Sequence, residues 1–312
     1  MEKSVFYLGV EGGGTKSTAI LCDANDKVIA QRTGKALSYQ VLGQKQAKEN
    51  LAALLQPFLK KTYKGKLYAV FGFAGLNSKA EKIIYTSIAK DVLPRTATFD
   101  AVNDAEISLE AECPNEKNRI LVISGTGASV FGQSGSKKTK AIGWDLVFGD
   151  EGSGYTIGLK TLKAAIQSFD GRGKKTVLEK LVLKKIGATR MDEATAKAHK
   201  TIEKNKYVMK SYIASFAPLV DIALAKNDPV AISIREDTIQ ELVQGVDAVA
   251  QRLAIQNKDF CLGFTGSVWK LPGLKSKFKS TLQKKYPKIR FSTENTSSGV
   301  WGAVLLAKKL NQ

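Results

Sequence analysis

The strongest constraint in the sequence is an apolar strand that runs directly into a glycine-rich turn, and this pattern occurs twice. Val5 to Val10 is an apolar run that ends at Glu11-Gly12-Gly13-Gly14. Arg119 to Ser124 is a second such run and ends at Gly125-Thr126-Gly127. After each turn the chain continues as strand-like segments rather than as a helix. Since 312 residues are about twice a typical single domain, the recurrence predicts two α/β lobes.

The remaining elements fit this division. The first half follows the order β-β-β-α-β-α-β, and in the second half strands enclose a long helical insertion with breaks at Pro218 and at Asn227–Pro229. The further strands are expected at Thr18–Asp23, Lys27–Gln31, Leu67–Phe73, Thr96–Phe99, Ser129–Gly132, Lys140–Ile142 and Phe260–Phe264. The helices are expected at Gly43–Leu59, Lys79–Ala89, from Gly154 to about Gln256, after Ser267, and at Ser297–Leu310. The expected fold class is therefore α/β, with domains 1–115 and 116–296 and a C-terminal helix, 297–312, packing back on the N-terminal lobe.

The first glycine turn has the chemistry of an anion site. Three consecutive glycines, Gly12 to Gly14, let backbone N–H groups converge on a phosphate without Cβ atoms in the way. A plain hairpin is the alternative. The turn is not a Walker P-loop, because the required Lys and Ser/Thr spacing is missing, and a strand rather than a dinucleotide-binding helix follows. A second turn at Gly125 to Gly127 makes a phosphate clamp more probable than either turn alone.

Three further segments carry candidate functional residues. Asp104 follows a strand that ends near Asp100, where side chains commonly face a ligand, although Asn103-Asp104 also suits an N-cap for a helix from Ala105. The stretch Gly143–Gly154 combines acidic residues and glycines with Trp144 and Phe148. The alternative there is that both aromatic residues anchor the core. Gly266-Ser267-Val268-Trp269 is a glycine corner after a strand.

Composition excludes several classes of mechanism. The single histidine, His199, argues against His-rich metal sites and a Ser-His-Asp relay, so proton transfer falls to a carboxylate or a lysine. Three scattered cysteines have no spacing for a zinc or iron–sulfur site.

The apolar run near the N-terminus is too short for a signal peptide or a membrane span, which predicts a cytoplasmic protein without a membrane partner. The net charge of +19 is spread along the chain, which disfavours nucleic acid as a partner.

Taken together and in this order, the motifs resemble the BadF/BadG/BcrA/BcrD-type ATPase family, and within it the N-acetylglucosamine kinases. The motifs that carry the resemblance are Val10–Thr15, Asn103-Asp104-Ala105, Ile123–Gly127, Gly143-Trp144, Gly149–Gly154 and Gly266–Trp269. The resemblance implies two ribonuclease-H-like lobes of the sugar kinase and actin superfamily that close over substrate, with ATP and Mg²⁺ as cofactors. The expected reaction is phosphorylation of the 6-hydroxyl of an amino sugar, N-acetylglucosamine first.

The resemblance also assigns roles to individual residues. Asp104 is the expected catalytic base, and Glu11 is the expected Mg²⁺ residue. The expected ATP-binding residues are Gly12, Gly13, Gly14, Thr15, Gly125, Thr126, Gly127, Gly266 and Ser267. The expected sugar-binding residues are Ser38, Asp104, Ser129, Gly143, Trp144 and Asp150.

Departures from the family pattern lie on the sugar side. Ser38 stands where these kinases often carry Asn, Ala128 and Asp145 also depart from the pattern, and the phosphate turns are intact. Glucosamine and N-acetylmuramic acid therefore stay open as acceptors. The family's other branch, ATPase activators of 2-hydroxyacyl-CoA dehydratase-like systems, is disfavoured by the cysteine pattern. A non-catalytic sugar- or nucleic-acid-binding regulator is the remaining alternative, and a homodimer stays open.

Overall fold

The chain folds into two compact units, each built around a five-stranded sheet. The computed structural model describes residues 4–62, 65–204, 208–293 and 299–312. Unit 1 comprises Met1–Glu116 and Ser292–Gln312, and unit 2 comprises Lys117–Phe291. The expected α/β fold class is confirmed, and the helical insertion lies in unit 2.

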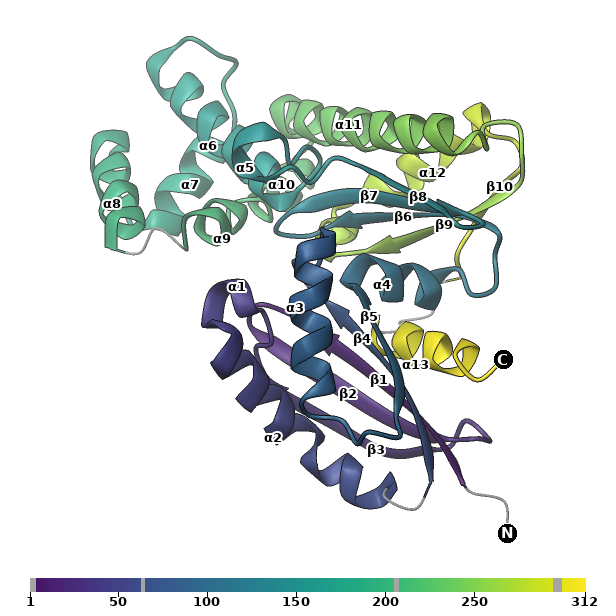
Figure 1. Ribbon diagram of the computed structural model, residues 1–312. Coiled ribbons are helices and arrows are strands. Elements are labelled where there is room, and N and C mark those ends of the chain that lie inside the picture. The colour runs from purple at the N-terminus through teal and green to yellow at the C-terminus, as the bar shows by residue number, and fades with distance from the viewer. Residues whose placement is uncertain (1–3, 63–64, 205–207, 294–298) are drawn as a thin grey trace. The chain divides into compact units, whose positions relative to one another are not determined.

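The sheet of unit 1 has the strand order β3-β2-β1-β4-β5 (Figure 1). Its strands are β1 (Val5–Gly12), β2 (Lys16–Asp23), β3 (Val28–Lys35), β4 (Lys66–Phe73) and β5 (Thr98–Asn103). The first three strands pair antiparallel as a meander, whereas β4 runs parallel to β1 and β5 parallel to β4. Because β1 and β4 are central, side chains on both faces are buried, which explains their nearly continuous apolar runs.

Helices cover both faces of this sheet. They are α1 (Tyr39–Leu42), α2 (Gln44–Thr62), α3 (Lys79–Lys90), α4 (Asp104–Glu112) and α13 (Gly299–Lys309). Alternate side chains of β1 enter different cores, since Leu8 and Val10 pack with residues of α2 and α3 while Tyr7 packs with residues of α4 and α13. Gly9 permits the close approach of α13, because a Cβ there would lie 2.5 Å from the carbonyl oxygen of Val300.

The sheet of unit 2 repeats this topology with the order β10-β9-β6-β7-β8. Its strands are β6 (Asn118–Ser124), β7 (Ala128–Ser134), β8 (Lys137–Ala141), β9 (Phe260–Thr265) and β10 (Ile289–Phe291). As in unit 1, the first three strands form an antiparallel meander, and the last two run parallel to the first. The recurrence of strand and glycine turn in the sequence therefore corresponds to a recurrence of topology.

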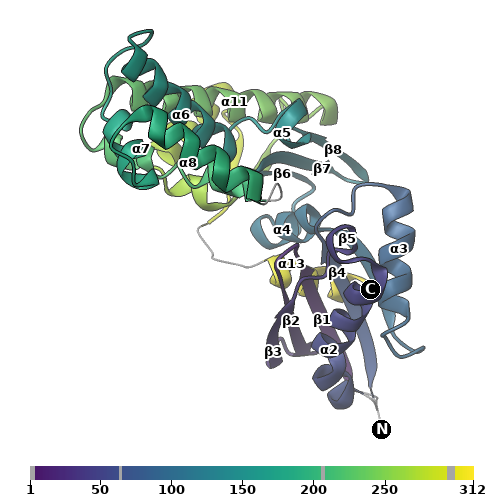
Figure 2. The same ribbon diagram turned by 90° about the vertical axis from the view of Figure 1, so that its left-hand side faces the viewer.

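The helices of unit 2 are mostly inserted between β8 and β9. They are α5 (Asp145–Phe148), α6 (Gly154–Asp170), α7 (Leu178–Ile186), α8 (Met191–Lys204), α9 (Met209–Ala214), α10 (Leu219–Leu224), α11 (Pro229–Leu253), η2 (Ser267–Lys270) and α12 (Leu274–Lys285). The long α11 lies along the sheet (Figure 1), and α6, α7 and α8 pack in sequence beside one another (Figure 2). Asp228 caps α11 by accepting from the N–H groups of Val230 and Ala231, which confirms the break expected at Asn227–Pro229.

Some expected boundaries differ from the observed ones. β10 was not expected, because three residues with a charged Arg290 give too short a pattern to separate from a loop. β5 ends at Asn103 rather than at Phe99, since the ladder with β4 continues through polar residues. The last helix is observed from Gly299, and the expected start at Ser297 lies outside the described residues. In the part of the chain that the structure describes, no helix is long and apolar enough to cross a membrane.

Candidate functional site

The first glycine turn joins β1 to β2 and offers two adjacent backbone donors. The N–H of Gly13 closes the turn by donating to the carbonyl of Lys16 at 3.0 Å. Within the described part of the chain, the N–H groups of Gly14 and Thr15 make no hydrogen bond, and both residues are exposed. Neighbouring N–H groups in such a turn attract an anion, as expected from the sequence. Gly12 also lines the pocket at this turn, and it permits close packing because a Cβ there would lie 2.9 Å from the ring of Phe73.

Asp104 lies in the same pocket as this turn. The pocket has a volume of about 450 Å³ and is lined by residues 11–18 and Asp104. The N-cap of α4 is Asn103, whose side chain accepts from the N–H of Ala105 at 2.8 Å and donates to the carbonyl of Leu76 at 3.0 Å. Asp104 is therefore not the cap, and its carboxyl lines the pocket instead.

The electrostatics of this pocket favour a proton-accepting role for Asp104. Burial raises the pKa of the Asp104 carboxyl above its ordinary range, and the negative charge of Glu11 raises it further. The N–H of Ala105 opposes the shift but does not cancel it. A carboxylate with a raised pKa is a stronger base than an exposed one, so the pocket combines anion donors with a carboxylate suited to proton transfer.

Ser38 lies outside the residues that line this pocket. Its side chain is buried, and its hydroxyl donates to Oε1 of Gln40 at 2.9 Å. Gln40 also accepts from the hydroxyl of Tyr85 at 2.8 Å and donates to the carbonyl of Gly75 at 2.8 Å. The Ser38 hydroxyl thus belongs to a network that ties α1 to the segment after β4.

The second glycine turn joins β6 to β7 and is also closed by a glycine N–H, over a shorter span of the chain. The N–H of Gly125 donates to the carbonyl of Gly127 at 2.8 Å, and the carbonyl of Gly125 accepts from the N–H of Gly154 at the start of α6, at 2.7 Å. In the described residues, the N–H groups of Thr126 and Gly127 make no hydrogen bond. The turn therefore offers two neighbouring donors and lies at the N-terminal end of a 17-residue helix, where the helix dipole also favours an anion.

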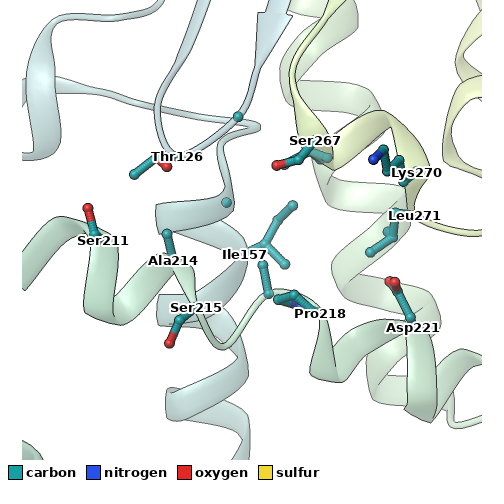
Figure 3. A pocket seen from close by; sticks show the side chains of 14 residues that line it. Thr126, Ile157, Ser211, Ala214, Ser215, Pro218, Asp221, Ser267, Lys270 and Leu271 are labelled. Carbon is teal, nitrogen blue, oxygen red and sulfur yellow. The ribbon is translucent and has the colours of Figure 1, made fainter. Parts of the chain in front are cut away.

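The corner between β9 and η2 packs against this turn. Gly266 has φ 109°, and a Cβ there would lie 2.1 Å from the carbonyl oxygen of Ser124, so only glycine fits. Gly125, Thr126 and Ser267 line one pocket of about 360 Å³ (Figure 3). The structure thus brings residues expected to bind ATP from two distant segments to a single pocket of unit 2.

The other walls of this pocket come from α6, α9 and α10 and from the segments around them. Sequence reasoning did not assign them, although the Phe216-Ala217-Pro218 stretch was a possible signal because it interrupts the helical pattern. The unassigned residues that line the pocket include Ile157, Ser211, Ser215, Pro218, Asp221, Lys270 and Leu271.

The carboxylate of Asp150 holds the end of the second turn in place. It is only 3% exposed, its Oδ1 accepts from the N–H of Ala128 at 2.7 Å, and its Oδ2 lies 2.8 Å from Nζ of Lys210. Nζ of Lys210 also lies 3.3 Å from Oδ1 of Asp145. Burial alone would lower the pKa of Lys210, but the two carboxylates raise it above its ordinary value. Lys210 was not predicted, because nothing in its local sequence marks a lysine that pairs with a segment sixty residues earlier.

Four of the residues expected near the sugar, Ser129, Gly143, Trp144 and Asp150, belong to unit 2. Gly143 has φ 75°, and a Cβ on it would lie 3.1 Å from the Cβ of Ser129. Trp144 is 58% exposed and Phe148 is 84% exposed, so the alternative that both anchor the core is wrong. Nζ of Lys140 lies 4.5 Å from the ring centre of Trp144. Trp269, by contrast, is a core residue whose Nε1 donates to the carbonyl of Thr265 at 3.1 Å.

Comparison with known proteins agrees with this architecture. The solved structure of a candidate N-acetylglucosamine kinase from Chromobacterium violaceum matches this fold with a TM-score of 0.69 at 19% identity, over 98% of this chain and 99% of that one. The family model described as the BadF/BadG/BcrA/BcrD ATPase family matches residues 8–307. The chain belongs to the BadF/BadG/BcrA/BcrD ATPase family, as the resemblance of its motifs predicted.

Two relatives match over nearly their whole length. An N-acetylmuramic acid/N-acetylglucosamine kinase of Clostridium acetobutylicum is 31% identical over 311 residues, which cover 97% of this chain and 98% of that protein. An N-acetyl-D-glucosamine kinase of Dictyostelium discoideum is 26% identical over 329 residues, which cover 98% of each. The matched regions therefore include both units of this chain.

Proposed function

We propose that this protein is an ATP-dependent kinase that transfers the γ-phosphoryl group of ATP to the 6-hydroxyl of N-acetylglucosamine. The observation that carries the proposal is the pocket of unit 1, where the Asp104 carboxyl and two free backbone donors of the first glycine turn face the same space. Similarity over the whole chain to two proteins named as N-acetylglucosamine kinases supports the choice of acceptor.

In this mechanism Asp104 is the general base. Its carboxylate accepts the proton of the sugar 6-hydroxyl as that oxygen forms a bond to the γ-phosphorus, and the bond from phosphorus to the bridging oxygen breaks to release ADP. The raised pKa of Asp104 improves its match to an alcohol proton. Positioning and stabilisation of charge on the phosphoryl oxygens supply most of the catalysis in such transfers.

Each glycine turn is a proposed phosphate-binding element of its own unit. The N–H donors are those of Gly14 and Thr15 in unit 1 and those of Thr126 and Gly127 in unit 2. Gly266 and Ser267 would border the nucleoside, because they adjoin the second turn at the pocket of unit 2. The donors are held by strand pairing before any ligand arrives, so binding costs little further ordering.

Mg²⁺ is the proposed metal, and it would neutralise charge on the ATP phosphates. Among the described residues, no group of three or more His, Cys, Asp and Glu side chains is placed to hold a metal ion. Proteins usually bind Mg²⁺ through one or two carboxylates together with substrate phosphates and water, so a larger cluster is not required. Glu11 fits this role, since it lines the pocket beside the first turn and its negative charge raises the pKa of Asp104.

Ser129, Gly143, Trp144 and Asp150 are the proposed sugar-side residues of unit 2. The exposed ring of Trp144 offers a flat apolar surface of the kind that sugar rings pack against, and its neighbour Gly143 lies against Ser129. Asp150 would act by holding the segment in place, because its carboxylate is already occupied by Ala128 and Lys210. Ser38 would act from unit 1 only through the Gln40 network.

Release of ADP in the presence of Mg-ATP tests the proposal. The acceptors to compare are N-acetylglucosamine, glucosamine, N-acetylmuramic acid, N-acetylmannosamine, glucose and no sugar. Stimulation by N-acetylglucosamine, with mass spectrometry placing the phosphate on the 6-oxygen, is the expected result. Equal ADP release with every acceptor and without any would contradict it.

N-acetylmuramic acid is a second candidate acceptor. The relative from Clostridium acetobutylicum is named for both sugars. Lys140, whose Nζ lies 4.5 Å from the ring centre of Trp144, would offset the extra carboxylate of that sugar. Comparable kcat/KM values for both sugars would assign dual specificity, whereas turnover with N-acetylglucosamine alone would exclude it.

A further inference from the structure

The pocket beside the second glycine turn is lined by a carboxyl group, one oxygen of which has no hydrogen-bond partner among the described residues. Asp221 lies in the first turn of α10 and lines this pocket with Pro218 and Leu271. Its Oδ1 is buried and has no hydrogen-bond partner in the part of the chain that the structure describes. Burial raises the pKa of Asp221, and no charged neighbour offsets that effect. A buried carboxyl oxygen without a donor is unfavourable, so its position at a pocket points to a ligand that supplies the donor.

The position of Asp221 indicates which part of a nucleotide it would meet. Figure 3 shows Thr126 of the glycine turn on one side of the pocket and Asp221 across from it, with its carboxyl oxygens turned towards Leu271. Ile157, Pro218 and Leu271 add apolar surface between these two ends. With phosphates at the glycine turn, the opposite end of the pocket receives the base, whose flat ring suits apolar walls.

We propose that Asp221 selects adenine by accepting a hydrogen bond from the exocyclic amino group of the base. Hypoxanthine carries a carbonyl oxygen at that position, which can donate no hydrogen bond and would leave the carboxyl unpaired. The inference rests on the proposed function in one respect only, namely that the second glycine turn holds nucleotide phosphates. It makes Asp221 a specificity-determining residue for the phosphoryl donor.

Direct binding of nucleoside diphosphates tests this assignment without any sugar. We would measure ADP, IDP and GDP binding to the full-length protein by isothermal titration calorimetry. The variants are Asp221→Ala and Asp221→Asn, with Asp259→Asn, an exposed carboxylate of the same unit, as the matched control. Thermal melting of each variant checks folding, and removal of an unpartnered buried carboxyl should leave the melting temperature unchanged or raise it.

The parent protein should bind ADP about tenfold more tightly than IDP, as expected when one buried partner is left unpaired. In Asp221→Ala the ADP affinity should fall by about tenfold with little change for IDP. In Asp221→Asn the preference should shrink, because an amide offers both a donor and an acceptor. The control should behave as the parent protein.

Three outcomes would overturn the assignment: an ADP-to-IDP ratio that is the same in the parent and both Asp221 variants, tighter binding of GDP than of ADP, or no ADP binding. A different result would contradict the proposed function. If the protein binds ADP with the expected preference but phosphorylates no sugar, Asp221 remains the adenine-selecting residue and the proposal of sugar kinase activity is wrong.

Discussion

The two glycine turns of this protein share a backbone design and differ in their surroundings. In each, the N–H of one glycine closes the turn, Gly13 onto Lys16 and Gly125 onto Gly127, and the next two N–H groups have no partner among the described residues. The first turn lies beside two carboxylates, Glu11 and Asp104, whereas the second lies at the N-terminal end of α6 and the carboxylate beside it, that of Asp150, is paired with Lys210.

The difference shows how the same strand–turn–strand unit can support two tasks, proton transfer and metal binding in unit 1 and nucleoside binding in unit 2. Strand pairing fixes the donors of both turns alike, since the strand orders of the two sheets correspond. The side chains that adjoin each turn then separate the tasks, because carboxylates suit proton transfer and metal binding while the apolar and polar walls of unit 2 suit a nucleoside. The following predictions test that separation.

Asp104→Asn should give the largest effect. It removes the proposed base, so sugar-dependent turnover should fall by about a hundredfold or more while ADP binding stays near that of the parent protein. Initial rates of ADP release and calorimetric ADP binding provide the two measurements. Asp91→Asn, an exposed carboxylate of the same unit, is the control. Parent-like turnover in Asp104→Asn would show that unit 1 does not supply the base.

Gly266→Ala should disturb the second turn and leave the first intact. Its Cβ would meet the carbonyl oxygen of Ser124 at 2.1 Å, and the positive φ adds strain. We expect nucleotide affinity to fall by about tenfold or more, measured by calorimetry. Gly135→Ala is the matched control, because Gly135 also has a positive φ, 58°, but a Cβ there meets nothing within 4 Å. Equal losses in the two variants would mean that backbone strain alone, and not the turn, is responsible.

Lys210→Met should have a moderate effect confined to unit 2. Loss of the ammonium group leaves the Asp150 carboxylate buried without its cation, which should loosen the Ala128 anchor of the turn. We expect KM for ATP to rise by roughly tenfold with a smaller change in kcat, and Lys210→Arg to restore part of the loss. Steady-state kinetics at varied ATP separates these constants. A change in kcat alone would indicate a role in chemistry rather than in holding the turn.

Glu11→Gln should shift the pH profile slightly. Burial and the Glu11 charge both favour the protonated form of Asp104, so activity should fall as pH decreases through a midpoint above the ordinary aspartate pKa. Removing the Glu11 charge lowers that pKa, so the acid limb of the kcat/KM profile should move to lower pH. Because Glu11 is also the proposed Mg²⁺ residue, the profile is measured at saturating Mg²⁺. An unmoved acid limb would separate Glu11 from Asp104.

Residues whose role depends on neighbours close in the sequence, such as those at turns, helix breaks and strand ends, were predictable. The strand-and-turn recurrence marked both sheets, and the breaks at Pro218 and Asn227–Pro229 marked helix boundaries. Asp104 was singled out because it follows a strand end, and it lines the pocket of unit 1, whereas the cap was identified only by the hydrogen bond that Asn103 accepts from Ala105. Such signals are visible because they depend on residues close together in the chain.

Residues defined by distant neighbours were not predictable in the same way. Lys210 pairs with Asp150 across sixty residues, and Asp221 enters its pocket only because α10 packs there. Whether the side chain of Trp144 is buried or exposed could not be decided from the sequence, since a tryptophan next to glycines occurs in both settings. Ser38 matched a family position, yet its hydroxyl is committed to Gln40.

The sequence by itself determined the two lobes, the two glycine turns and the carboxylate after the fifth strand. Apolar periodicity determines which segments form strands, and only glycine tolerates the close approach found at Gly266. Residue type and order therefore determine these features. The tertiary structure alone decided which side chains adjoin each turn. Helix packing makes that choice, and it depends on surfaces assembled from segments that no local pattern connects.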